Sequence, residues 1–101
     1  MKLWVDDVRT LPSPDSEWAW AGSVHEAMLL IMNAEVRNCP FELIDIDHDA
    51  GDYANDGGDY IKLLDWLEET GRNYPIHIHS MNPVGVQNMR AIIKRNNWVE
   101  I

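Results

Sequence analysis

The chain has 101 residues, of which 46 % are hydrophobic and 25 % charged, and its formal net charge is −9. This length suits one domain with a buried core and leaves no room for a second, so we expect residues 1–101 to form a single domain. The negative charge repels the phosphates of DNA and RNA, which argues against binding to long nucleic acids. No apolar run approaches the ~20 residues that cross a bilayer, so no membrane span is expected.

Two features indicate a cytoplasmic protein. The apolar stretch at the N-terminus is too short for a signal peptide, because acidic residues interrupt it after residue 5. Cys39 is the single cysteine and cannot form an internal disulfide, which fits a reducing compartment.

The chain begins with a short apolar run at residues 2–5 that ends at Asp6 and Asp7. This pattern predicts a buried strand with two carboxylates at its C-terminal end. Pro12 and Pro14 follow closely, and each restricts the residue before it, so an extended loop is expected rather than a helix.

Residues 18–21 can form a second strand, and a helix should follow it. Ser23 and Glu26 have the spacing of a capping box, which marks the start of that helix. Apolar residues then recur at helical spacing until the pattern fades near residues 38–40.

Residues 41–46 predict a third strand, which ends in the acidic segment Asp47-His48-Asp49. Residues 51–58 are rich in Gly, Asp and Asn and predict a mobile loop. Asp59 is expected to cap the helix that comes next.

Gly71 is expected to end that helix in the left-handed conformation. Residues 75–80 predict a fourth strand. Asn82 and the proline after it predict the cap and first turn of a third helix, which runs to about Lys94. Residues 98–101 can supply a fifth, terminal strand.

Strands that alternate with helices predict an α/β fold with a mostly parallel sheet of about five strands. In such sheets, ligands bind beyond the carboxyl ends of the strands where the strand order reverses. Acids follow the first and third strands, at Asp6 and Asp47, and His79, Ser80 and Asn82 follow the fourth. We expect these three strand ends to converge.

This order of motifs resembles response-regulator receiver domains, which have a flavodoxin-like fold. The resemblance implies that Asp6 and Asp7 help to bind magnesium, that Asp47 accepts a phosphoryl group, and that Ser80 contacts that group.

The chain also departs from a standard receiver. Prolines occupy the region of the first receiver helix, and the final helix has no counterpart. No lysine matches the one at the tip of the fifth receiver strand, since Lys94 precedes the predicted fifth strand. We therefore expect a receiver-like fold with its first and last helices reduced or absent.

A second resemblance is closer. The segments Asp6-Asp7-Val8-Arg9, Asp47-His48-Asp49 and His79-Ser80-Met81-Asn82-Pro83 are similar to those of the cyclic-phosphate processing receiver domain. The matching positions are Asp6, Asp7, Arg9, Asp47, His48, Asp49, His79 and Asn82. The resemblance implies action on a small cyclic phosphate ester, such as the 2′,3′-cyclic phosphate end of an RNA.

The residue types suit that chemistry. Carboxylate oxygens are the ligands that Mg²⁺ and Mn²⁺ prefer, and the predicted metal ligands are Asp6, Asp7, Asp47 and Asp49. A metal ion could polarise both the phosphate and an attacking water.

The other polar residues have assignable roles around such a metal. His79 or His48 could act as general acid or base beside Asp47, because imidazole titrates near neutral pH. Arg9 could pair with phosphate oxygens, and Ser80 could contact the phosphoryl group. Asn82 could bind the substrate or only cap its helix.

Three functions remain open from the sequence. The first is a metal-dependent cyclic phosphodiesterase or phosphohydrolase, or a binder of such phosphates. The second is a signalling module that is phosphorylated on Asp47, and the third is a catalytically silent adaptor that keeps its metal.

The predicted sheet also suggests a protein interface. Trp18 and Trp20 alternate onto one face of the second strand, and Trp4 shares a face with Asp6 in the first. If these faces coincide and no helix covers them, three large rings form a patch suited to a homodimer or a protein partner.

Overall fold

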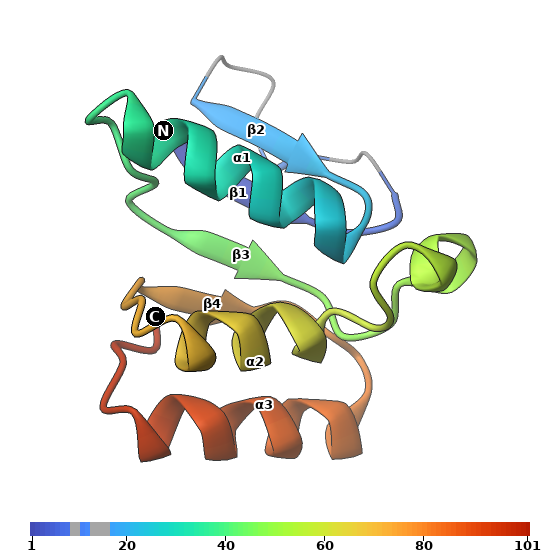
Figure 1. Cartoon of the computed structure of the whole chain (residues 1–101). Helices are drawn as coiled ribbons and strands as arrows, with labels where there is room; N and C mark the ends of the chain where they lie inside the picture. The colour runs from blue at the N-terminus through green and yellow to red at the C-terminus, as the bar shows by residue number, and fades with distance from the viewer. Residues whose placement is uncertain (9–10, 13–16) are drawn as a thin grey trace.

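The computed structural model describes residues 1–8, 11–12 and 17–101. Strands and helices alternate along the chain, which confirms the α/β prediction (Figure 1). In chain order, the elements are β1 (Lys2–Val5), β2 (Trp18–Ala21), α1 (Val24–Val36), β3 (Ile44–Ile46), the 3-10 helix η1 (Gly51–Asn55), α2 (Ile61–Glu69), β4 (Ile76–Ile78) and α3 (Pro83–Arg95).

The four strands form one sheet in the order β2-β1-β3-β4, and every pair of neighbours is parallel. From β1 the chain moves outward to β2 and then returns to the other side of β1 to form β3. The strand order therefore reverses between β1 and β3, the point at which sheets of this kind bind ligands.

One face of the sheet carries the core. Helices α1 and α2 pack against this face, and α3 lies beside α2 (Figure 1). Leu3 and Val5 of β1 and Ile44 and Ile46 of β3 are fully buried. Helix α2 adds Leu63, Leu64 and Leu67, all without solvent exposure. In the described part of the chain, no helix is long and apolar enough to cross a bilayer.

The local signals for helix ends are confirmed. Ser23 Oγ accepts a hydrogen bond from the Glu26 N–H at 3.1 Å, so Ser23 caps α1 as predicted. Gly71 follows α2 with φ of +68°, the left-handed conformation that glycine adopts without strain. Asn82 caps α3, whose first residue is Pro83.

The predicted fifth strand is wrong, and the sheet has four strands in the described part of the chain rather than about five. Residues 98–101 make one isolated bridge, between Ile76 and Glu100. Ile76 donates to the Val99 carbonyl at 2.9 Å and accepts from the Ile101 N–H at 2.8 Å. Because the segment meets β4 only at the first of its three residues, no ladder can form.

Two further predictions need correction between β3 and α2. Asp59 does not cap α2, because its carboxylate accepts a hydrogen bond from the Ala50 N–H at 3.0 Å and Tyr60 is the N-cap residue. The segment predicted as a loop contains the 3-10 helix η1, while its mobility stays a prediction. Strands β3 and β4 are also shorter than the runs predicted at 41–46 and 75–80.

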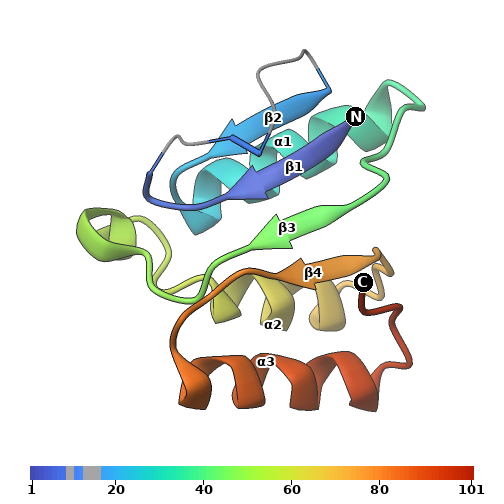
Figure 2. The same ribbon diagram turned by 180° about the vertical axis from the view of Figure 1, so that it is seen from behind.

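The opposite face of the sheet carries the tryptophans. No helix in the described residues lies over this face (Figure 2). Trp4 and Trp18 meet edge to face with ring centroids 5.9 Å apart, and Trp4 is in register with Trp20. The three rings therefore share one surface, as expected, while a protein partner for it stays a prediction. Residues 9–10 and 13–16, in the region of the first receiver helix, lie outside the described residues.

Candidate active site

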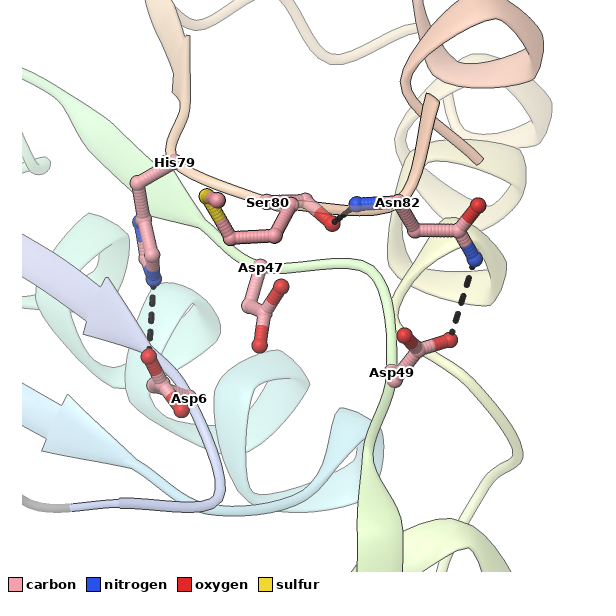
Figure 3. A pocket seen from close by; sticks show the side chains of 7 residues that line it. Asp6, Asp47, Asp49, His79, Ser80 and Asn82 are labelled. Atoms are coloured by element: carbon pink, nitrogen blue, oxygen red, sulfur yellow. Dashed lines mark hydrogen bonds and ion pairs between the residues drawn. The ribbon is translucent and has the colours of Figure 1, made fainter. Parts of the chain in front are cut away.

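The C-terminal ends of β1, β3 and β4 surround a pocket of about 420 Å³ (Figure 3). The sequence predicted that these strand ends converge, because the carboxyl ends of parallel strands lie at one edge of the sheet. The residues that line the pocket are Asp6, Asp47, Asp49, His79, Ser80, Met81 and Asn82.

Acidic side chains are crowded on one side of this pocket. Asp6, Asp47 and His79 each offer a possible metal-binding atom, and these atoms lie within 4.8 Å of one another. A hydrogen bond with Asp6, burial, and the nearby charges of Asp6 and Asp47 raise the pKa of Asp7. Asp7 is therefore part of the same cluster, although it does not line the pocket.

Asp6 is held in its ionised form. Burial by itself would raise the pKa of Asp6, but hydrogen bonds from the Val8 N–H, Asp7 and His79 lower it. The Val8 N–H donates to Asp6 Oδ1 at 3.0 Å. The carboxylates of Asp6 and Asp7 repel each other when both are charged, and a bound cation would relieve that repulsion.

Both ring nitrogens of His79 face carboxylates. Nε2 lies 2.9 Å from Asp6 Oδ2, and Nδ1 lies 2.6 Å from Asp45 Oδ1. The ring also stacks on Trp4, with centroids 3.9 Å apart and planes 2° from parallel. A protonated ring, with an N–H at each nitrogen, can donate to both carboxylates at once.

The pKa of His79 reflects these partners. Burial by itself would lower the pKa of the imidazole, but the hydrogen bonds to Asp45 and Asp6 and their negative charges outweigh burial and raise it.

This shift predicts how stability depends on pH. Because the pKa of His79 is higher in the folded chain than its ordinary value of 6.5, its contribution to stability is complete below that pH. The contribution is lost as the pH rises through the folded-state pKa. In EDTA, we expect urea unfolding to show a larger stability difference between the native chain and His79→Gln at pH 6 than at pH 9. A difference that does not change with pH would contradict a raised pKa for His79.

Asp49 lies on the other side of the pocket, beyond Asp47 (Figure 3). Asp49 Oδ1 is 2.8 Å from His48 Nδ1, and Asn82 Nδ2 donates to the same oxygen at 3.5 Å. Among the possible metal-binding groups, Asp49 falls with His48 and Asp59 rather than with Asp6 and Asp47, and its role as a metal ligand stays a prediction.

His48 is not among the residues that line the pocket. Its ring packs against Gly85 in the first turn of α3, so closely that a Cβ atom on Gly85 would lie 2.4 Å from His48 Cγ. The imidazole is 14 % exposed and contacts Asp49, which lines the pocket.

Ser80 and Asn82 connect β4 to α3. Ser80 Oγ accepts a hydrogen bond from the Asn82 N–H at 3.1 Å, and Asn82 Oδ1 accepts one from the Gly85 N–H at 3.1 Å. The predicted cap is present, and the amide nitrogen of Asn82 remains on the pocket side (Figure 3). Arg9, the predicted phosphate ligand, lies outside the described residues.

A family model described as the cyclic-phosphate processing receiver domain matches residues 1–95 of the chain. The chain belongs to this family. No curated protein and no solved structure gives a significant match. The parallel four-stranded sheet agrees with the receiver-like fold that membership of the family implies.

The sequence of this cyclic-phosphate processing receiver domain did not lead us to predict Asp45 as a partner of the site histidines. Asp45 lies in the middle of β3, and its carboxylate contacts both His77 and His79. The signal was present, because an acid inside an apolar strand is uncommon and alternation places Asp45 on the same face as Asp47.

Proposed function

We propose that this receiver domain is a metal-dependent enzyme that hydrolyses small cyclic phosphates, such as the 2′,3′-cyclic phosphate of a nucleotide or of an RNA end. The observation that carries the proposal is the meeting of Asp6, Asp47 and His79 at one pocket, with ligand atoms within 4.8 Å of one another. Membership of the family supports cyclic phosphates as the substrate class.

Asp6, Asp7 and Asp47 would hold the metal. Their carboxylate oxygens are hard ligands suited to Mg²⁺ or Mn²⁺, and the raised pKa of Asp7 beside Asp6 marks a crowded set of like charges that a cation would neutralise. When bound, such an ion supplies Lewis-acid polarisation of a phosphoryl oxygen and of a water molecule. His79 is assigned as the proton donor rather than as a ligand, because both its ring nitrogens already contact carboxylates.

The chain also offers donors for the phosphate oxygens. The Asn82 amide lines the pocket, and α3 begins directly after it, so the positive end of the helix dipole lies at the pocket wall. These groups can hold a phosphate opposite the acidic cluster, where the anion would otherwise be repelled.

Hydrolysis needs a proton donor and a proton acceptor. A water oxygen bonds to phosphorus, the bond from phosphorus to one ribose oxygen breaks, and that oxygen takes up a proton. The Nε2–H of His79 can supply this proton, and Asp49 across the pocket can accept the proton that the water loses. His48, 2.8 Å from Asp49 Oδ1, orients that carboxylate.

The size of the site and the net charge define the substrate further. A pocket of about 420 Å³ lies in the range that holds small ligands, roughly 300–1,000 Å³. A formal charge of −9 disfavours a long polyanion, so a nucleotide or a single RNA end fits better than a duplex.

A signalling role through phosphorylation of Asp47 is the alternative. It is less well supported, because no lysine is among the residues that line the described pocket. Incubation with 2′,3′-cyclic nucleotides and Mn²⁺ or Mg²⁺ is expected to yield a nucleoside monophosphate, and acetyl phosphate is expected to leave no stable acyl phosphate. An acyl phosphate on Asp47 without turnover of cyclic nucleotides would favour signalling, and neither result would favour a silent adaptor.

A further inference from the structure

Asp45 is a buried carboxylate in the centre of the sheet. It is 6 % exposed and lies in register between Trp4 of β1 and His77 of β4, on the face that no described helix covers. Burying a charged group is costly unless it is paired, so its position requires specific partners.

Those partners are two imidazoles on β4. Asp45 Oδ1 accepts from His77 Nδ1 at 2.9 Å and from His79 Nδ1 at 2.6 Å. His79 in turn reaches Asp6 Oδ2 through Nε2 at 2.9 Å. A continuous line of polar contacts therefore runs from the open sheet face, through Asp45, to the pocket.

The contact with Asp45 decides how the His79 ring is oriented. Stacking on Trp4 fixes the plane of the imidazole but not which edge faces the pocket, because a half-turn about its last torsion gives nearly the same shape. That half-turn would exchange Nδ1 for a carbon at Asp45, and Nε2 for a carbon at Asp6. Only one of the two orientations keeps both hydrogen bonds.

We propose that Asp45 is a positioning residue for His79, which holds the ring so that its Nε2–H faces Asp6 and the bound phosphate. The catalytic meaning of this inference rests on the proposed function, whereas the orientation of the ring does not. His77 is the second partner of the same oxygen; it is not among the residues that line the pocket.

The kinetic test uses a graded set of variants. Asp45→Ala removes the acceptor and is expected to lower kcat for a 2′,3′-cyclic nucleotide by about 10–100-fold, as for other partners that orient a catalytic group, with KM within about twofold. Asp45→Asn keeps an acceptor oxygen and is expected to lose less than Asp45→Ala. Asp65→Ala is the matched control, because it removes a carboxylate on α2 that pairs with Lys62 instead of a histidine, and it should leave kcat within about threefold.

A second measurement does not need turnover. Long-range ¹H–¹⁵N spectra report the protonation and hydrogen bonding of each ring nitrogen of His79. Asp45→Ala is expected to change the Nδ1 signal, while the control Asp65→Ala is not. If Asp45→Ala does not fold, Asp45→Thr takes its place, because threonine suits a strand and its hydroxyl is too short to reach His79.

The outcomes separate the two proposals. If the native chain has no activity and the His79 signal still depends on Asp45, the proposed function fails and the positioning role stands. If the native chain is active and Asp45→Ala retains both kcat and the His79 signal, the positioning role is overturned.

Discussion

Asp47→Asn is expected to abolish binding of Mn²⁺ and hydrolysis of cyclic phosphates while the fold is kept. The amide has the shape of the carboxylate and can still accept the His48 N–H, which lies 2.7 Å from Asp47 Oδ1. It removes a negative charge from the cluster that would hold the metal. We expect the Kd for Mn²⁺ to rise by more than the ~10–100-fold that outer-shell partners cost, since Asp47 would contact the ion itself.

Without metal, Asp47→Asn is expected to be at least as stable as the native chain. In EDTA, loss of one charge relieves the repulsion with Asp7, whose pKa is raised partly by Asp47. Thermal unfolding should therefore give Asp47→Asn a Tm equal to or above that of the native chain. Added Mg²⁺ should raise the Tm of the native chain and leave that of the variant unchanged.

Asp65→Asn is the control for this experiment. It changes the net charge by the same amount, but Asp65 lies on α2 and pairs with Lys62 at 4.0 Å rather than with the cluster. Titration calorimetry should give this control the Mn²⁺ affinity of the native chain. If Asp47→Asn also bound Mn²⁺ with native affinity, Asp47 would not be a metal ligand.

Gly85→Ala is expected to destabilise the chain by about 1–2 kcal/mol, even though alanine favours helices by up to ~1 kcal/mol over glycine. The new Cβ would lie 2.4 Å from His48 Cγ and 2.5 Å from Cδ2, which are atoms of a rigid ring. The ring cannot yield freely because its Nδ1 contacts Asp49 at 2.8 Å. Overpacking of this kind costs about 1–3 kcal/mol, so the clash outweighs the gain in helix propensity.

A double-mutant cycle with His48→Ala isolates the cause. Removal of the ring gives the new methyl group room, so Gly85→Ala should be neutral or stabilising in a His48→Ala background. Urea unfolding of the four proteins gives the coupling energy. Val84→Ala is the control, because Val84 is 66 % exposed in the same turn of α3 and touches the solvent rather than the ring. Equal effects of Gly85→Ala in both backgrounds would show that His48 does not pack there.

Much of the fold was predictable because its signals are local. The apolar run before Asp6 and the cap at Ser23 depend on residues within a few positions, and β1 and α1 form where these signals place them. The prediction of a terminal strand was wrong because strand pairing is not a local property. Residues 98–101 look like a strand, but pairing depends on how much of β4 they can reach, and they bond only to Ile76.

The approach of Asp6, Asp47 and His79 also followed from the sequence, since parallel strands bring their carboxyl ends to one edge of the sheet. Periodicity and strand order are properties of the chain read in one dimension. The partners within the site are different. Asp49 contacts His48, and His79 contacts Asp45.

Only the tertiary structure decided these pairings, and the reason is physical. Several acceptors lie within a few ångströms of each polar side chain, so small differences in distance decide which of them it contacts. Those distances are fixed by the strand spacing, by the stack of His79 on Trp4 and by the close approach of Gly85 to His48. Spacing along the sequence determined which side chains reach this edge of the sheet, whereas packing between elements determined which of them touch.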